Sequence, residues 1–253
     1  MKDNRYIRNI ILPEIALDGQ IKLANSRILI IGAGGLGSAI LYYLVCAGIA
    51  DSDYGQDGEI MLIDDDVVEI SNLQRQILHN QFDIGESKIS SAVNKIKLLN
   101  SKINIKALKT RIDEHQLQEI GLNYSIIIDA SDNFSTRFII NKFCFEAKKT
   151  LIFGAVRAFS GQLATFKSFI GSNPCYCCFN TTLDRNNADL VISEKGILGA
   201  VAGNLGTHQA ISAVKEILQI GDLSYSKMMI CDFLSNRFYS VKINKNPACK
   251  ICS

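Results

Sequence analysis

The chain has 253 residues, of which 47% are hydrophobic and 21% charged, which fits one folded α/β domain with a sizeable core. Its 27 basic and 25 acidic residues give a formal net charge of +2, so the charge does not favour binding to nucleic acid or to a membrane surface. No apolar run approaches the roughly 18 residues of a membrane-spanning helix. The opening MKDNRYIRNI lacks the apolar core of a secretion signal, and we expect a cytoplasmic protein.

Strands and helices are predicted to alternate through the first two thirds of the chain. Short, wholly apolar runs are typical of parallel strands buried on both faces, and apolar residues at helical spacing, as from Ile89 to Leu99, predict helices. In chain order we expect a helical opening to Asn25, a strand at 28–31, a helix around 40–45, a strand at 59–66, a helix at 87–100, a strand at 103–110, a short helix at 115–121, a strand at 124–133, a helix at 137–148 and a strand at 150–156.

The alternation predicts a doubly wound, mainly parallel sheet with helices on both faces. After Gly154 the pattern changes. Residues 161–169 and 227–243 are typical of antiparallel strands, and a helix is expected between them at 203–218. The predicted fold is therefore an α/β sheet that continues into an antiparallel C-terminal part.

A glycine-rich loop joins the first predicted strand to its helix. Gly32, Gly34 and Gly37 match G-x-G-x-x-G, a pattern that lets backbone N–H groups approach a phosphate at a helix N-terminus. Asp64 ends the next strand and could bind a ribose hydroxyl. The glycines could instead serve only to pack the helix against the strand, and the loop by itself does not separate NAD from ATP.

A polar cluster follows Asp64 and contains Asn72, Arg75, Gln76 and Lys88. A dehydrogenase has no need of this group, whereas cations offset the phosphate charge that builds during nucleotidyl transfer. The cluster therefore favours a nucleoside triphosphate as the ligand. The alternative is a solvated polar loop.

Two aspartates lie at the end of the strand in IIIDASDN. Asp129 and Asp132 come at the carboxyl end of a buried strand, where ligands bind in open α/β sheets. One of them could hold Mg²⁺, a hard cation that prefers carboxylate and phosphate oxygens. Alternatively, one of them caps the helix that follows.

The cysteines include two C-x-x-C pairs, in NPCYCCF and NPACKICS. Such a pair of pairs predicts a closed, tetrahedral structural zinc site with the ligands Cys175, Cys178, Cys249 and Cys252. A redox C-x-x-C is the alternative, and Cys177 could in principle replace a ligand. The remaining cysteines lie in apolar stretches and are expected to be buried, namely Cys46, Cys144 and Cys231.

Motifs along essentially the whole chain resemble one family. They are, in order, RYIRNIILPEI, GQIKL, IGAGGLGS, DDDVVEISNLQRQILH, DIGESK, DASDN, GAVRAFSGQ, GILG and the two C-x-x-C pairs. This order is similar to that of the MoeB/ThiF/HesA proteins, bacterial adenylyltransferases that resemble ubiquitin-activating enzymes. The resemblance implies a Rossmann-like domain that binds ATP and adenylates the C-terminal glycine of a ubiquitin-like sulfur carrier protein, for molybdopterin or thiazole synthesis.

The resemblance also assigns parts of the chain. It implies a single ThiF-type domain over 1–253, with a nucleotide-binding part at 1–154 and an antiparallel, zinc-binding and carrier-docking part at 155–253. The residues that match the family's site are Gly32, Gly34, Gly35 and Gly37 in the nucleotide loop, Asp64 at the ribose, Asn72, Arg75 and Lys88 at the phosphates, Gln76 in the same motif, Asp132 at Mg²⁺, and Arg8, which reaches the ATP site of a partner protomer. The match at Arg8 implies a homodimer.

Two departures from the family limit what carries over. Many members have a cysteine, able to form a thioester or persulfide, where this chain has Ile192, so adenylation alone is expected. The polar segment from Ala50 to Glu59 is longer than usual and is expected to be a surface insertion. Three other functions stay open: adenylation of a peptide C-terminus or a tRNA base, non-catalytic binding of a ubiquitin-like protein, and NAD-dependent oxidoreduction.

Overall fold

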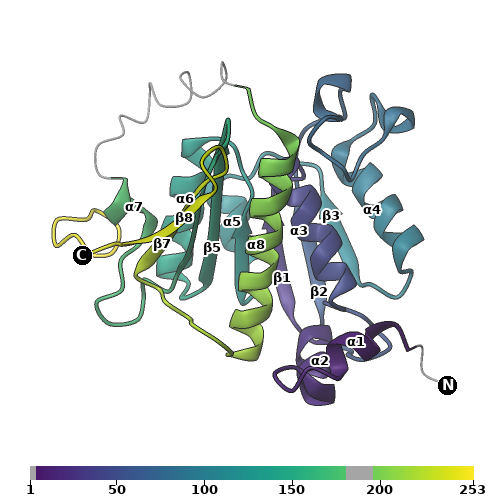
Figure 1. Cartoon of the computed structure of the whole chain (residues 1–253), viewed down its shortest axis with the longest axis horizontal. Coiled ribbons are helices and arrows are strands. Elements are labelled where there is room, and N and C mark those ends of the chain that lie inside the picture. The colour runs from purple at the N-terminus through teal and green to yellow at the C-terminus, as the bar shows by residue number, and fades with distance from the viewer. Residues whose placement is uncertain (1–3, 181–195) are drawn as a thin grey trace.

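A single sheet of eight strands runs through the residues that the computed structural model describes, 4–180 and 196–253 (Figure 1). Its strand order is β3-β2-β1-β4-β5-β6-β7-β8. The strands from β3 to β5 in that order are parallel, and the other three are antiparallel. Their bounds are β1 Arg27–Ile31, β2 Glu59–Ile63, β3 Ile105–Leu108, β4 Ile126–Asp129, β5 Thr150–Arg157, β6 Ser160–Phe166, β7 Lys227–Asp232 and β8 Arg237–Lys242.

The helices lie on both faces of this sheet, which confirms the predicted fold class (Figure 1). One face is covered by α3, α4 and α8 and the other by α5 and α6. Two short helices precede β1, and one-turn helices lie at 4–6, 70–72 and 81–83. The α-helices are α1 Ile7–Ile10, α2 Ala16–Ala24, α3 Gly35–Cys46, α4 Lys88–Leu99, α5 Glu114–Gly121, α6 Phe134–Glu146, α7 Tyr176–Phe179 and α8 Gly199–Leu218.

Apolar strands explain why the sheet is covered on both sides. Ile28 of β1 pairs with Ile60 of β2 on one side and with Ile126 of β4 on the other, and all three side chains are buried. Strands with apolar residues facing both ways need a helix layer on each face. The carboxyl ends of these three strands therefore meet at one edge of the sheet, where polar side chains can gather.

Two helices begin earlier than predicted. The α6 helix starts at Phe134 because the side chain of Asn133 accepts a hydrogen bond from the Thr136 N–H at 2.9 Å and caps the helix. The α8 helix starts at Gly199. Cys144 and Cys231 are buried as predicted, but the prediction for Cys46 is wrong, since it ends α3 where that helix reaches solvent.

The segment from Ala50 to Glu59 contributes to the structure at the amino ends of the strands. The carboxylate of Asp51 is buried and accepts hydrogen bonds from the Tyr6 hydroxyl at 2.5 Å and from the Asn100 side chain at 2.8 Å. These contacts tie the N-terminal helices to the turn before β3. The segment is therefore more than a surface insertion.

Ile192, the residue at the family's cysteine position, lies outside the described residues. Within residues 4–180 and 196–253, no helix has the combination of length and apolar character needed to cross a membrane.

Candidate functional site

The glycine loop lies where the carboxyl ends of β1, β2 and β4 meet. The Gly32 N–H donates a hydrogen bond to the Ile63 carbonyl at 2.8 Å. Gly32 has a φ of +106°, and a Cβ atom there would lie 2.6 Å from the carbonyl oxygen of Ala130, closer than real Cβ atoms come. The structure thus brings the loop, the end of β2 and the DASDN segment together, as predicted.

The glycines of the loop have different roles. A Cβ atom on Gly37 would overlap the Gly32 carbonyl oxygen, and one on Gly35 would lie 2.9 Å from the Ala202 Cβ, so both glycines are needed for packing. Gly34 differs, because the nearest atom to a Cβ there is Gln76 Nε2, at 3.8 Å. The protein's own packing does not require a glycine at 34, which leaves this face of the loop open to a ligand at the start of α3.

Two side chains hold the backbone of Ala33 in this loop, one at its N–H and one at its carbonyl oxygen. Its N–H donates to Asp64 Oδ2 at 2.7 Å, and its carbonyl oxygen lies 3.3 Å from His79 Nε2. His79 Nδ1 in turn lies 2.8 Å from the Ser91 hydroxyl of α4. Burial lowers the pKa of His79, and because the Ala33 carbonyl can only accept, Nε2 is the ring nitrogen that donates to it. This positioning role was missed from the sequence, where only the place of His79 in QRQILH pointed to it.

Asp64 and Lys88 form the charged part of the site. Burial raises the pKa of Asp64, and the positive charge of Lys88 opposes this shift. Lys88 begins α4, is almost fully buried, and forms an ion pair with the exposed Asp66 at 2.7 Å. A buried ammonium group whose partner is exposed can exchange that partner for a phosphate with little rearrangement.

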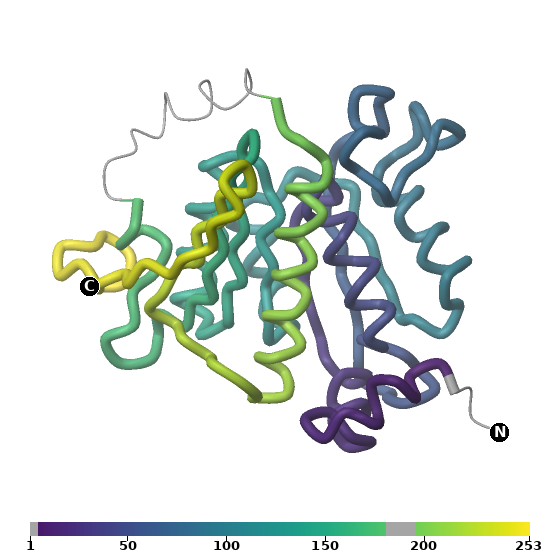
Figure 2. The backbone as a smooth tube through the Cα atoms, in the orientation of Figure 1, coloured from purple at the N-terminus to yellow at the C-terminus, as the bar shows by residue number. Residues whose placement is uncertain are grey.

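The predicted Arg75, Gln76 and Asn72 lie in the segment between β2 and α4. Arg75 is half-buried beside Gly35 and donates to the Ser71 carbonyl at 2.9 Å. Gln76 is buried, and within the described chain its Oε1 has no hydrogen-bond partner. Asn72 is also buried, and its side chain closes the one-turn helix at 70–72. Figure 2 shows this segment, in blue, at the end of the molecule opposite the N-terminal helices.

The two aspartates of DASDN lie in different environments. Asp129 is buried, and its Oδ1 accepts from the Ser131 N–H at 2.9 Å and from the Ser131 hydroxyl at 2.6 Å. Asp132 is exposed. Neither caps α6, because Asn133 does so. Of these two aspartates, only Asp132 is accessible to a hydrated cation.

Arg137 was missed by the sequence reasoning. It is buried on α6 and donates to the Ser131 carbonyl at 2.9 Å, so it holds the backbone just before Asp132. Burial raises the pKa of Asp129, and the Arg137 charge opposes that shift. No spacing in the sequence indicated this contact.

Arg8 lies far from this site in its own chain. It is exposed on α1, near the amino ends of the strands, where the neighbouring Arg5 donates to the carbonyl of Leu99 at the end of α4 (Figure 2). The structure therefore does not bring Arg8 together with Arg75, Lys88 and Asp132 within one protomer.

The two C-x-x-C pairs form a second site at α7 and the C-terminus, on the side of the molecule that carries β7 and β8 (Figure 1). The four sulfur atoms of Cys175, Cys178, Cys249 and Cys252 all lie within 4.8 Å of one another. The Cys175–Cys249 and Cys178–Cys252 distances are 3.6 and 3.4 Å, and Cys175–Cys178 is 4.0 Å. Tetrahedral Zn–S bonds of about 2.3 Å would place sulfur atoms about 3.8 Å apart, so the cluster fits zinc.

Contacts around the cluster explain how distant cysteines meet. The Asn141 side chain of α6 accepts from the Tyr176 N–H at 2.9 Å, and the Asn246 N–H donates to Cys178 Sγ at 3.4 Å. Cys177 is outside the cluster, where its sulfur accepts from Asn141 at 3.4 Å. Hydrogen bonding from Cys177 lowers the pKa of the Cys175 thiol to about 4, whereas burial raises the pKa of the Cys178 and Cys252 thiols.

Curated relatives match this chain over most of its length. A sulfur carrier protein adenylyltransferase from Thermus thermophilus is 34% identical over 252 residues, which is 98% of this chain and 90% of the relative. A probable molybdopterin-synthase adenylyltransferase from Porphyra purpurea is 43% identical over 215 residues, which is 85% of this chain. The chain spans about half the length of the Porphyra relative, which is covered to 54%.

The fold is also shared with a solved enzyme structure, E. coli MccB with ATP, at a TM-score of 0.82 and 25% identity over 100% of this chain and 75% of that one. A model described as the ThiF family matches residues 6–251. The predicted enzyme class, an adenylyltransferase, is confirmed by these relatives. The chain therefore belongs to the ThiF family.

Proposed function

We propose that this chain uses ATP to adenylate the C-terminal carboxylate of a ubiquitin-like sulfur carrier protein. The observation that carries the proposal is the open face of the loop at Gly34, which lies beside the buried Gln76. The ion pair of Lys88 with an exposed aspartate supports it, because a triphosphate can replace that partner. The carrier as substrate is supported by the name of the Thermus relative.

The chemistry follows from the charges in the site. A carboxylate is a poor electrophile and must be activated before a sulfur nucleophile can attack it. In the activation step, one carboxylate oxygen attacks the α-phosphorus of ATP. The bond from the α-phosphorus to the bridging oxygen breaks, and pyrophosphate leaves with that electron pair. Arg75 and Lys88 would offset the negative charge on the triphosphate as it separates. The product is a mixed anhydride that a sulfur nucleophile can attack.

Asp132 is the residue that we propose to hold Mg²⁺, because it is the accessible carboxylate of its segment. When bound, Mg²⁺ would supply Lewis-acid stabilisation of phosphate oxygens. Asp129 is already engaged with Ser131 and serves the backbone instead.

We assign the cysteine cluster to a structural zinc ion. Four ligands close the coordination sphere, so the site offers no open position for substrate. The cluster joins the C-terminal turn to α7, and zinc would thus hold the end of the chain against the sheet.

A homodimer is proposed from exposed apolar side chains near Arg8. Ile11 and Leu17 are 58% and 51% exposed on the N-terminal helices. Ile70 and Phe82 are 76% and 84% exposed beside the nucleotide site. Contact between these two surfaces in a pair of protomers would bury both and bring Arg8 of one chain toward the triphosphate of the other. The cytoplasmic location and the division of the domain at residue 154 stay predictions.

Carrier-dependent exchange between ATP and labelled pyrophosphate tests the proposed function. We expect Asp132→Ala to abolish exchange while the melting temperature is kept. The matched control is Glu119→Ala, which removes an exposed carboxylate on α5 and should leave exchange intact. Full exchange by Asp132→Ala would refute the assignment of this residue.

The acceptor is tested separately by mass spectrometry of each carrier encoded in the same genome after incubation with enzyme and ATP. A carrier acyl adenylate supports the proposal. Adenylation of a peptide C-terminus alone would instead favour the alternative acceptor named in the sequence analysis. Thermal stabilisation by NAD but not by ATP would overturn both.

A further inference from the structure

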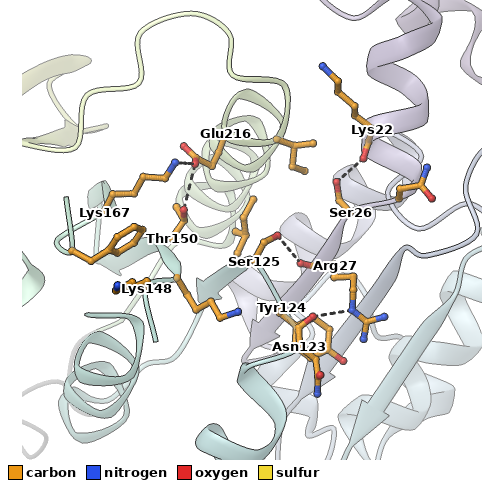
Figure 3. Close-up of a pocket in the computed structure, with 15 residues that line it drawn as sticks. Lys22, Ser26, Arg27, Asn123, Tyr124, Ser125, Lys148, Thr150, Lys167 and Glu216 are labelled. Carbon is orange, nitrogen blue, oxygen red and sulfur yellow. Dashed lines mark hydrogen bonds and ion pairs between the residues drawn. The ribbon is translucent and has the colours of Figure 1, made fainter. Parts of the chain in front are cut away.

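A basic groove lies at the amino ends of β1, β4 and β5, at the opposite edge of the sheet from the nucleotide site (Figure 3). Its volume is about 740 Å³, within the range of small-molecule sites. β1 alone separates the two edges by roughly 15 Å. The groove is therefore distinct from the ATP site.

Positive charge dominates this groove. Four lysine residues line it, with Glu216 as the single acidic residue; they are Lys22, Lys148, Lys149 and Lys167. Arg27 also lines it, but its charge is balanced by Glu59 at 2.9 Å. Glu216 is buried and already engaged by Lys167 and by the hydroxyl of Thr150, so it does not offset the remaining lysines.

Helix ends account for only part of this charge. The helices α2, α6 and α8 all end at the groove, and lysines are favourable near helix C-termini. Four lysines against one glutamate leave an excess of three positive charges. The C-terminal end of each helix carries about half a negative charge, so three helix ends offset about 1.5 of these three charges. About one to two positive charges remain without a partner in the fold.

Two of the lysines are free to bind a ligand. Within residues 4–180 and 196–253, the ammonium groups of Lys22 and Lys148 have no hydrogen-bond acceptor or ion-pair partner, and both side chains are exposed. Figure 3 shows them on opposite sides of the groove, with Ser125 and Thr150 between them. Phe169 and Ile217 add half-buried apolar surface to the lining.

We propose that this groove binds a small dianion, a phosphomonoester or a dicarboxylate, between Lys22 and Lys148. The net charge that remains suits two negative charges on one head group. Phe169 and Ile217 would support an uncharged body attached to that head group. A long polyanion such as nucleic acid is disfavoured, because the chain as a whole has a net charge of only +2.

Isothermal titration of phenyl phosphate and of phthalate into the full chain tests this proposal. Saturating Mg²⁺ and a non-hydrolysable ATP analogue fill the nucleotide site, so that the probes cannot bind there. We expect one bound probe per chain with a dissociation constant of about 1 mM or tighter, and weaker binding in high salt. Tighter binding of phenyl phosphate assigns the site to phosphomonoesters, and tighter binding of phthalate assigns it to dicarboxylates.

The double variant Lys22→Gln/Lys148→Gln should weaken binding about tenfold or more. The matched control, Lys242→Gln/Lys245→Gln, removes the same charge outside the groove lining and should bind as the unmodified chain does. Both variants should keep carrier-dependent pyrophosphate exchange, which verifies the fold. Unchanged affinity in the groove variant, or no binding by the unmodified chain at about 10 mM probe, would overturn the proposal.

Discussion

Substitution of Gly37 by alanine should mainly lower the stability of the chain, whereas substitution of Gly34 by alanine should mainly weaken ATP binding. In Gly37→Ala the new Cβ atom overlaps the Gly32 carbonyl oxygen, so the loop must shift at a cost of about 3 kcal/mol. For a chain of this length that loss lowers the melting temperature by about 6–12 °C. In Gly34→Ala the nearest atom to the Cβ is Gln76 Nε2, 3.8 Å away, so the added Cβ atom meets ordinary contact rather than an overlap.

The Gly34→Ala variant should therefore be destabilised much less than Gly37→Ala, because its Cβ atom displaces no backbone atom of the loop. Its Cβ would occupy the face that we propose for a phosphate, so the affinity for an ATP analogue should fall about tenfold or more. Thermal unfolding and isothermal titration measure the two effects. Unchanged ATP affinity in a stable Gly34→Ala variant would refute the argument that the phosphate lies against this glycine.

Three further predictions concern other parts of the two sites. Lys88→Gln should lower the rate of pyrophosphate exchange about 100-fold, because a cation beside the triphosphate is lost, and exchange at the original rate would exclude this role. Burial lowers the pKa of His79 in the folded chain, so its contribution to the free energy of unfolding is complete above the unfolded pKa of about 6.5 and is lost as the pH falls below that value. In urea unfolding between about pH 5 and 7, His79→Gln should reduce the dependence of this free energy on pH. An unchanged dependence in the variant would show that other groups cause it. Cys175→Ser should reduce bound zinc, measured by elemental analysis, and destabilise the chain, whereas a full zinc content would show that the cluster is not the metal site.

Much of the fold follows from local patterns in the sequence. Ile28, Ile60 and Ile126 belong to apolar runs that read as buried parallel strands, and these strands pair side by side in the structure. Helix starts were less predictable. The start of α6 depends on a cap at Asn133 rather than on apolar spacing, because the hydrogen bond to Thr136 sets the first turn.

The meeting of the glycine loop, the end of β2 and the DASDN segment was predictable from the sequence, whereas the contacts of individual side chains were not. Residues from Gly32 to Asp132 converge because parallel strands present their carboxyl ends at one edge, a consequence of topology that motifs reveal. The buried contacts of His79 and Arg137 could not be foreseen, because they join segments that are remote in sequence or match no motif. His79 links the Ala33 carbonyl to Ser91 of α4, and Arg137 of α6 donates to the Ser131 carbonyl. The exposure of Cys46 likewise depends on where α3 leaves the sheet.

The sequence by itself determined the order of strands and helices, the glycine loop with its following cluster, and the two cysteine pairs, because these depend on residue type and short-range spacing. The tertiary structure alone decided which glycines pack the loop and which one leaves it open, and that Asp129 serves the backbone while Asp132 faces solvent. It also placed Arg8 at the far end of the sheet and four lysines around one groove. The physical reason is that these properties depend on distances between segments remote in sequence, which only the packing of helices on the sheet sets.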